Sequence, residues 1–507
     1  MSSDEARGRR ASGGPGSISG RGRAREEHRA RIYPEGMPRR IRSLALPGWR
    51  DPETVFLAVG AGAPRVAWLD GGADAAEGRS VIAVAADGAP AVIGGPEAEP
   101  DAVAAALAAH VDGTNLAGQV RAGERAAVGW HGWFGYEFGA RTLGVPAAVA
   151  DAAGPAVPEV AFFLADRVVV FEHGPRRVRL EWLEDDAADD AGRRAIAEWV
   201  RATTHAIATA PAAAPSVRPP GQDEAAAPPA PTRWRHPPDE YRRMILECQA
   251  AITRGDAYQL CLTNRVDVDV RPDPVATYLA LRASSPSHHG GFVRIDDVAL
   301  LSASPEQFLL VEPDGTVATK PMKGTRPRSA DPAADAALRA ELHASEKERA
   351  ENLMIVDLMR NDLGRIAELG TVRVPHLLEV EEYPHVHQLV STVSARLRHP
   401  LTALDAVRSA FPAGSMTGAP KLSAMTILHG LERGPRGVYS GAFGCLGVDG
   451  GADLAMVIRS ILVTPAGASI GTGGGITALS DPDEEIEETH VKARALIAVL
   501  GGRMPPG

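Results

Sequence analysis

Lys323 stands in the segment PMKGTRPR, which runs from Pro321 to Arg328 and places the lysine directly before a Gly-Thr pair. Gly324 permits a backbone turn that a side chain would obstruct, and the prolines are expected to stop a helix or a central strand from running through. Burial lowers the pKa of a lysine, so that its amine becomes a nucleophile or a base. Moving that pKa from about 10.4 to about 7 takes about 4–5 kcal/mol of environment. Taken alone, the motif is more typical of a solvated loop lysine. Whether Lys323 is instead a buried, reactive lysine depends on the segments around it.

Two predicted helices each carry a pair of glutamates three residues apart, Glu348 with Glu351 and Glu485 with Glu488. Residues three or four apart on a helix are neighbours, and each pair alone is typical of a solvated face. Brought together, the four carboxylates would form an oxygen-ligand site suited to Mg²⁺. Lys492, four residues after Glu488, would be a simple helix partner or an anion contact beside the metal.

Other segments offer groups that bind anions or move protons. The run GTGGG, Gly471 to Gly475, is expected to follow a strand and precede a loop, either as a plain turn or with backbone N–H groups converging on an anion. The segment GSMTGAPK ends at a predicted helix start, where N–H groups also meet anions. Arg459, predicted within the apolar strand MVIRSIL, would pair with a structural acid or face a ligand carboxylate. Glu306 follows an apolar strand, where it is an ordinary edge-strand acid or an acid/base group whose pKa burial raises.

The elements that position these residues follow from composition and periodicity. Residues 1–40, rich in Gly, Ser and Arg, predict a disordered tail. Residues 41–207 form an N-terminal region in which VFLAVG, RVAWLD, SVIAVAADG and AVIGG are expected to be strands. Residues 208–236 have the Pro/Ala composition of a linker, either between two domains or looped out between two halves of one. Residues 237–501 alternate helices and strands, including a long helical region from Asp331 to Leu369 and a last helix from Asp483 to Leu500.

Composition excludes several classes of protein. The net charge of −10, with no basic stripe, argues against a nucleic-acid partner. No apolar run reaches the roughly 18 residues of a membrane span. The three cysteines are too far apart for a disulfide framework or a metal site, and the N-terminus lacks the apolar core of a signal peptide. The sequence therefore predicts a cytoplasmic protein without membrane contact.

Taken together, the segments resemble the chorismate-utilising enzymes. The strings that carry the resemblance are SASPEQF, PMKGTRPR, EKERAENLMIVDLMRNDLGR, AGSMTGAPK, YSGAFGCLG, IRSI, GTGGGI and EEIEETHVKA, in the family's order between Pro238 and Leu500. The resemblance implies an α+β fold of two antiparallel β-sheets packed as a sandwich, with helices outside and the site between the sheets.

The resemblance also implies roles for individual residues. Lys323 would attack carbon 2 of chorismate as the 4-hydroxyl leaves, with Glu306 as general acid/base near that hydroxyl. Glu351 and Glu488 would ligate Mg²⁺, supported by Glu348 and Glu485. The groups expected to bind or line the substrate are Arg459, Tyr439, Thr417, Lys492, Gln388 and the backbone of Gly473, Gly474 and Gly475.

The lysine also indicates a branch of the family. Aminodeoxychorismate-type members resemble PIKGT and anthranilate-type members PIAGT, whereas this chain has PMKGT. Gln259 stands where salicylate-type members have a lysine that activates water, so amination of chorismate to 4-amino-4-deoxychorismate, for 4-aminobenzoate and folate, is expected. No nucleophilic cysteine elbow is present, so ammonia is expected from a separate glutamine amidotransferase subunit, unless free ammonia suffices. The alternatives are an anthranilate synthase component I and a non-catalytic subunit that binds chorismate or an amino acid.

Two departures from the family's pattern remain. Many relatives have a histidine before Leu-Val-Ser, whereas this chain has Gln388 there and His387 one position earlier. A shift of one residue reverses the face of a strand, so His387 is not expected to substitute for it. The segment SPSHHGGF, Ser285 to Phe292, also departs from the family, and the sequence offers no account of it.

Overall fold

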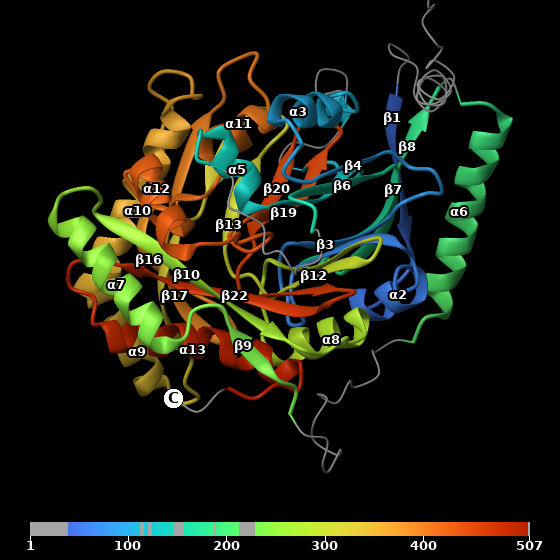
Figure 1. Cartoon of the computed structure of the whole chain (residues 1–507). Helices are drawn as coiled ribbons and strands as arrows, with labels where there is room; N and C mark the ends of the chain where they lie inside the picture. The colour runs from blue at the N-terminus through green and yellow to red at the C-terminus, as the bar shows by residue number, and fades with distance from the viewer. Residues whose placement is uncertain are drawn as a thin grey trace, which may run out of the picture.

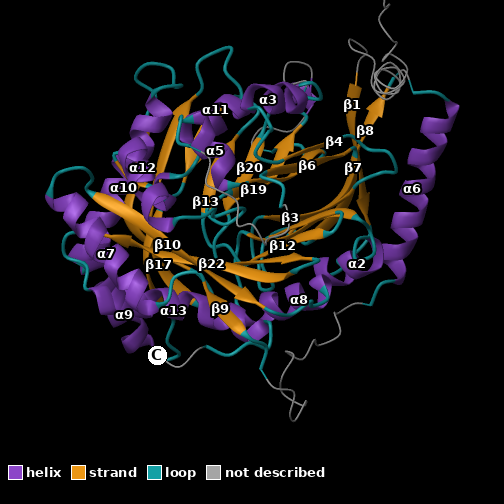
Figure 2. Cartoon of the chain, in the orientation of Figure 1, coloured by secondary structure: helices purple, strands orange, loops and turns teal. Residues whose placement is uncertain are grey.

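The computed structural model describes residues 39–111, 116–119, 124–146, 157–186, 188–211 and 229–504. Within them, two antiparallel sheets lie in the interior, and helices surround them (Figure 1, Figure 2). The predicted sandwich is therefore confirmed. The expected tail, apart from its last two residues, and most of the expected linker lie outside the described residues. No described helix has the length and apolar character needed to cross a membrane.

The first sheet has twelve described strands, with β9 (Thr232–Trp234) paired to β10 beside the main path. In spatial order the path is β1 (Arg39–Leu46), β8 (Arg177–Asp185), β7 (Arg167–Glu172), β3 (Arg79–Val84), β2 (Arg65–Asp70), β11 (Gly290–Ile295), β12 (Val298–Ser302), β21 (Ser460–Thr464), β22 (Gly467–Ile476), β10 (Gln259–Val268) and β18 (Gly418–Ala419).

The second sheet has ten described strands, with β16 (Arg373–Glu382) paired to β17 beside the main path. The path is β15 (Met322–Pro327), β17 (Val386–Arg396), β14 (Thr316–Thr319), β13 (Gln307–Val311), β20 (Ala452–Met456), β19 (Ala442–Gly447), β5 (Gly129–Phe134), β6 (Val160–Ala165) and β4 (Ala91–Gly94).

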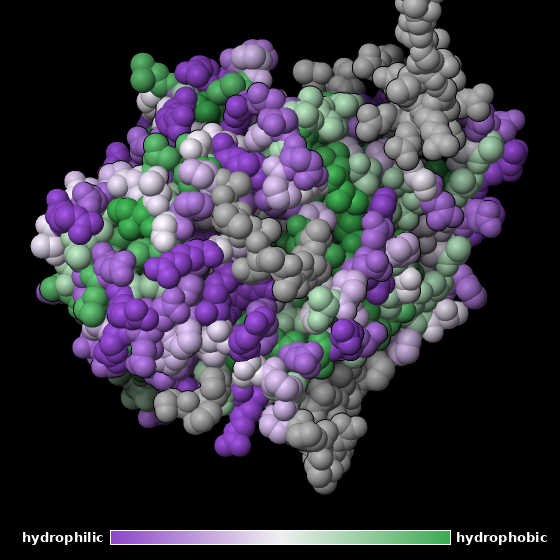
Figure 3. All heavy atoms as spheres, in the orientation of Figure 1, coloured by the Kyte–Doolittle hydropathy of each residue, from purple (hydrophilic) through white to green (hydrophobic). Residues whose placement is uncertain are grey.

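The helices cover the outer faces of the sheets. They are α2 (Pro52–Val59), α3 (Pro100–Ala108), α5 (Tyr136–Thr142), α6 (Asp190–Thr209), α7 (Pro238–Thr253), α8 (Pro274–Ser284), α9 (Pro332–Ala344), α10 (Glu346–Gly364), α11 (Ala403–Ala410), α12 (Lys421–Glu432) and α13 (Pro482–Val499). On the face shown in Figure 3, hydrophilic residues gather on the side of α7 and α13.

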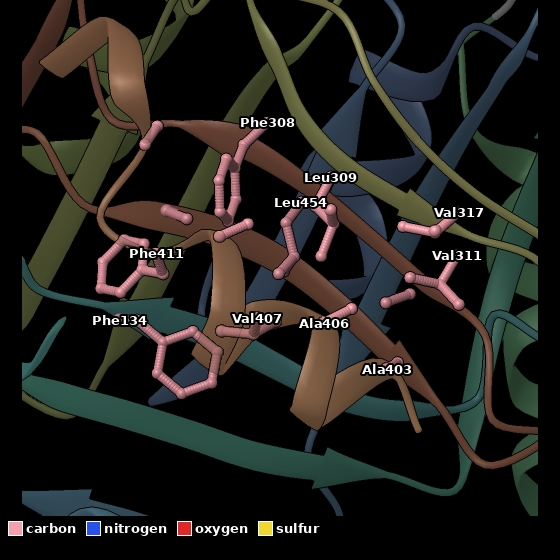
Figure 4. Close-up of a cluster of buried hydrophobic side chains, with 14 of the residues drawn as sticks. Phe134, Phe308, Leu309, Val311, Val317, Ala403, Ala406, Val407, Phe411 and Leu454 are labelled. Carbon is pink, nitrogen blue, oxygen red and sulfur yellow. The ribbon is translucent and has the colours of Figure 1, made fainter. Parts of the chain in front are cut away.

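Apolar clusters lie on both sides of each sheet. Between the sheets, Trp133 and Phe163 of the second sheet pack in one cluster with Ala67 and Val293 of the first. Outside the second sheet, Phe308 and Leu454 pack in one cluster with residues of α10 and α11, part of which Figure 4 shows. Burial of this apolar surface, at about 25 cal/mol per Å², stabilises the layered arrangement.

Both sheets run across the two predicted regions of the chain. In the first sheet β2 pairs with β11, and in the second β5 pairs with β19. β6 and β7 follow one another directly in the chain, but each belongs to a different sheet. The chain therefore crosses between the layers at Asp166.

Two predicted elements differ from the structure. VFLAVG was expected to be a strand but lies mostly in helix α2, because Asp51 accepts a hydrogen bond from the backbone N–H of Glu53 and Pro52 opens the first turn. The single long helical region is two helices, α9 and α10. Ser345 separates them and caps α10 through the backbone N–H of Glu348.

Candidate active site

Lys323 lies on β15, an edge strand, rather than on a turn that ends a strand. β15 pairs with β17 and carries a bulge between Lys323 and Thr325, where Gly324 has a φ of 78°. A Cβ at Gly324 would meet Leu342 at 2.7 Å and Glu348 at 2.9 Å, so the bulge requires glycine. The prolines are tolerated because an edge strand leaves one row of backbone groups unpaired. The expected turn is thus corrected to a glycine bulge at a sheet edge.

The Lys323 side chain is mostly buried and points at the predicted metal ligands. Its Nζ lies 3.7 Å from Oε2 of Glu351, and 17 % of the side chain is exposed. Burial lowers the pKa of Lys323, but the carboxylates of Glu351, Glu306 and Glu488 raise it, and the net pKa is above the ordinary value. The expectation of a lowered pKa is therefore wrong for the protein alone, because opposite charges outweigh desolvation.

Glu306 lies between β12 and β13 and is buried. The Ser415 hydroxyl donates a hydrogen bond of 2.9 Å to its Oε1. Burial raises the pKa of Glu306 to about 7, against the opposing effects of Ser415 and Lys323. A carboxyl that exchanges its proton near neutral pH suits general acid/base work, which favours that interpretation over an ordinary edge-strand acid.

Helices α10 and α13 bring the four glutamates close enough to influence one another. Glu351 and Glu485 are buried, whereas Glu488 is exposed. Burial, then the charge of Glu351, raises the pKa of Glu348, and burial, then Glu488, raises that of Glu485. The two glutamate pairs are therefore one group of interacting carboxylates and not two independent solvated helix faces.

Three lysines lie beside these carboxylates and offset their negative charge. Besides Lys323 at Glu351, Lys347 lies 3.7 Å from Glu485, and Lys492 lies 2.6 Å from Glu488 while donating to the Gly473 carbonyl at 2.8 Å. Lys492 is thus both the predicted helix partner and a contact of the glycine strand. Although Glu488 is exposed, desolvation by the surrounding protein raises its pKa, but Lys492 and other lysines bring the net value below the ordinary one.

The donor set has the chemistry that Mg²⁺ requires. All four candidates supply carboxylate oxygens, and Oε2 of Glu485 is buried with no hydrogen-bond partner in the described part of the chain. Within the described ranges, no three His, Cys, Asp or Glu side chains are placed to hold an ion as they stand. The lysines contribute the positive charge that balances the site in this arrangement.

Gly471 to Gly475 lie within strand β22, paired with β10, and not at a strand end as expected. A Cβ at Gly471 would enter the ring of Tyr439, and one at Gly475 would meet the amide of Gln259 and come within 3.6 Å of Lys323 Nζ. At Gly474 it would lie 2.8 Å from Oε2 of Glu485. We call Gly471–Gly475 the glycine floor, because its glycines leave room for Tyr439, Gln259, Lys323 and Glu485.

Arg459 is not within a strand, as was expected, but on the connection from β20 to β21, where the chain passes between the sheets. Its φ of 50° is left-handed, and its side chain is exposed and has no ion-pair partner among the described residues. Burial by the surrounding protein nevertheless lowers its pKa, against the opposing effects of Tyr439 and Glu488. An accessible guanidinium without an ion-pair partner among the described residues favours the interpretation that Arg459 faces a ligand carboxylate over the interpretation that it pairs with a structural acid.

Two further predicted residues, Gln388 and Thr417, are buried. Gln388 is buried, and its Oε1 has no partner in the described part of the chain, whereas His387 bonds Asp335 of α9 at 3.0 Å. Thr417 is fully buried and donates to the Ala413 carbonyl at 3.2 Å, so its hydroxyl supports the loop that carries Ser415. Sequence reasoning missed Ser415 and Lys347, although each lies inside a segment that it had singled out.

Solved structures share this arrangement of two sheets. Anthranilate synthase component I from Streptococcus pneumoniae is 27 % identical with a TM-score of 0.66, covering 92 % of this chain and 94 % of that one. The menaquinone-specific isochorismate synthase MenF from Escherichia coli, at 16 % identity and a TM-score of 0.64, shares the fold, covering 94 % of this chain and 98 % of that one.

The chain belongs to the chorismate binding enzyme family, whose model matches residues 68–498. It is 44 % identical over 373 residues to aminodeoxychorismate synthase of Streptomyces pristinaespiralis, covering 74 % of this chain and 51 % of that protein. It is 39 % identical to aminodeoxychorismate synthase component 1 of Klebsiella aerogenes, covering 73 % and 76 %, and 43 % identical to anthranilate synthase component 1 of Streptomyces coelicolor, covering 73 % and 72 %. The chain spans about half the length of the first of these relatives.

Proposed function

We propose that this chain is the aminating component of an aminodeoxychorismate synthase, converting chorismate and ammonia to 4-amino-4-deoxychorismate. The observation that carries the proposal is the position of Lys323, whose Nζ lies beside Glu351 and near Gly475 of the glycine floor, with the Glu306 charge acting on it. Relatives named aminodeoxychorismate synthase support the same activity. The product would serve 4-aminobenzoate and folate synthesis.

In the proposed reaction the lysine amine is the first nucleophile. Neutral Lys323 attacks carbon 2 of chorismate, both conjugated ring double bonds shift, and the 4-hydroxyl leaves as water with a proton from Glu306. Ammonia then adds at carbon 4 and gives up a proton to Glu306, the two double bonds shift back, and the lysine is expelled as the free amine. Covalent catalysis of this kind divides one difficult displacement into two easier ones. Arg459 and Lys492 would hold the substrate's carboxylates, and Gln388 would hydrogen-bond the departing hydroxyl through its unpartnered amide oxygen, Oε1.

Mg²⁺ is the proposed cofactor, held by Glu351 and Glu488 with support from Glu348 and Glu485. When bound, it would hold a substrate carboxylate and offset the negative charge that now raises the pKa of Lys323. The unpartnered Oε2 of Glu485 supports this assignment.

Ammonia would come from a separate glutamine amidotransferase subunit. The three cysteines of the chain, Cys248, Cys261 and Cys445, are buried and free, and burial raises the pKa of each thiol. Buried thiols of this kind are poor nucleophiles, so none suits a glutaminase role. Unbridged cysteines also support the cytoplasm as the place of action.

The test is the product formed by the purified chain with chorismate, Mg²⁺ and ammonium. We expect 4-amino-4-deoxychorismate by mass, without pyruvate. The second candidate is an anthranilate synthase component I, which the Streptococcus structure and the Streptomyces coelicolor relative favour. Anthranilate and pyruvate formed together would establish that candidate and overturn our proposal.

Replacing Lys323 separates the catalytic role from a non-catalytic one. We expect Lys323→Ala and Lys323→Arg each to lower product formation by at least about 10²-fold, because neither offers a comparable nucleophile, and arginine stays protonated. Lys323→Arg is the matched control, since it keeps the positive charge near Glu351. Wild-type turnover in both variants would exclude covalent catalysis, and turnover in the arginine variant alone would reduce Lys323 to an electrostatic role.

A further inference from the structure

The unexplained segment SPSHHGGF forms the connection from α8 to β11. Its His288 ring stacks flat on the ring of Tyr383, with centroids 4.0 Å apart and planes 8° from parallel. Tyr383 follows β16 and belongs to the second sheet's side of the sandwich, whereas β11 belongs to the first. The stack therefore joins the two layers.

On one side, this segment holds the turn that carries Glu306. The Ser287 hydroxyl donates to the Ser304 carbonyl, and the backbone of Pro305 lies close enough to the His288 ring to act on its pKa. Both contacts fall within two residues of Glu306. The backbone on which the candidate acid stands is thus held by consecutive residues of one loop.

On the other side, Tyr383 is tied to both ends of the strand that carries Lys323. Its hydroxyl donates to Glu381, which accepts a bond of 2.9 Å from Lys320, three residues before Lys323. Its carbonyl accepts a bond of 3.2 Å from Arg328, five residues after Lys323. The tyrosine on which His288 stacks is therefore linked by hydrogen bonds to residues on both sides of β15.

We propose that His288 is a positioning residue: its stack on Tyr383 and its contact with Pro305, beside the bond from Ser287 to Ser304, hold the Glu306 turn in place relative to Lys323. This inference rests on the proposed function, since it assigns those two residues to one reaction. Burial, together with His289 and Lys320, lowers the pKa of His288 to about 3, so the ring is neutral and lies against Tyr383 without a charge. A displacement of about 1 Å between reacting groups can cost on the order of 10²-fold in rate.

The experiment compares substitutions at both rings in the full chain. We expect His288→Ala to lower kcat by about 10- to 100-fold with little change in KM for chorismate. His288→Phe keeps a stacking ring but not the polar contact with Pro305, and should retain more activity than His288→Ala. Because the two rings share one contact, His288→Ala and Tyr383→Ala combined should cost less than the sum of the two single effects. His376→Ala, an exposed histidine on β16, is the control and should leave kcat unchanged.

A second readout does not require turnover. The Glu306 carboxyl can be titrated by carbon-13 NMR of glutamate-labelled chain, assigned with Glu306→Gln. We expect the wild-type pKa of about 7 to fall toward the ordinary range in His288→Ala, because a loosened turn admits water. The other groups acting on that carboxyl, Ser415 and Lys323, are unchanged in the variant.

The outcomes distinguish failure of the positioning role of His288 from failure of the proposed function. Unchanged kcat and unchanged Glu306 titration in His288→Ala would overturn the positioning role. A fall in kcat that only follows the loss of folded protein, with Glu306 titrating as in wild type, would also overturn it. If the wild-type chain forms no aminated product, the proposed function fails, but the shift in Glu306 titration still tests the effect of His288 on the turn.

Discussion

Glu306 connects local environment to a measurable pH dependence. Burial raises its pKa to about 7, so the acid form is present below that pH and is lost above it. Since the proposed role donates a proton, we expect kcat to contain a limb near pH 7 that falls as pH rises. Glu306→Gln should remove this limb and lower kcat by about 10²–10⁴-fold, as measured by pH profiles of both proteins. A limb that persists in the glutamine variant would assign it to another group.

Lys347 lies among the same carboxylates as the proposed metal. Although burial lowers its pKa, Glu485, Glu351, Glu488 and Glu348 all raise it, and the net pKa is above the ordinary value. Its ammonium therefore competes with Mg²⁺ for the same negative charge. We expect Lys347→Ala to tighten Mg²⁺ binding roughly fivefold, in line with about 1 kcal/mol for a partly exposed ion pair, measured by calorimetry with the metal alone. Replacing an exposed cation elsewhere, as in Arg193→Ala, should leave Mg²⁺ affinity unchanged, and equal affinity of the Lys347 variant and wild type would contradict the prediction.

At the scale of elements, the glycine floor sets the shape of the site. Gly471 lies under the Tyr439 ring, so Gly471→Ala must displace that ring. We expect a higher KM for chorismate and a loss of about 1–3 kcal/mol in the free energy of unfolding, as for other overpacking substitutions. Steady-state kinetics and urea unfolding measure the two effects.

The matched control for this substitution is Gly430→Ala in helix α12, where an added Cβ meets nothing within 4 Å. Alanine there should stabilise the chain by about 0.4–1 kcal/mol and leave the KM for chorismate unchanged. If Gly471→Ala had the wild-type KM, the Tyr439 ring would not contribute to substrate binding.

At the scale of the whole molecule, a buried ion pair of the C-terminal part lies where that part contacts the N-terminal part. Arg436 donates to Glu432 at 2.7 Å and to the Cys261 carbonyl at 2.9 Å, and its guanidinium lies 4.2 Å from the ring centre of Tyr136 on α5. Glu137, next to that tyrosine, accepts a bond of 2.7 Å from the Arg436 backbone N–H. These contacts fix the loop that carries Tyr439.

Removing one charge of this pair should destabilise the entire chain. Glu432→Gln is expected to lower the free energy of unfolding by about 3–5 kcal/mol, because a buried arginine loses its counter-charge. Asp190→Asn, at an exposed pair, is the control and should cost less than about 1 kcal/mol. Since both sheets cross the two regions, far-UV circular dichroism and tryptophan fluorescence should report one coincident urea transition. Two separate transitions would show that the regions unfold independently.

The sequence alone predicted most helices and strands of residues 237–501 and the chemical types present at the site. This succeeded because helical periodicity is a local signal, as in α13. The order of the family segments also led to the expectation that Lys323 and the four glutamates lie together, and the structure places Lys323 Nζ 3.7 Å from Glu351. The same local reasoning failed at VFLAVG, where an apolar run outweighed the Asp-Pro signal of a helix start.

Only the tertiary structure decided the charge state of Lys323 and the place of Arg459. The pKa of Lys323 depends on the balance between desolvation and carboxylates from two helices and a distant turn, and no sequence spacing gives that balance. Arg459 lies where the chain passes from one sheet to the other, which follows from strand pairing and not from its apolar neighbours. The partners of the glycine floor and the stack of His288 on Tyr383 likewise join residues far apart in the chain, because packing between layers brings together what local propensity cannot relate.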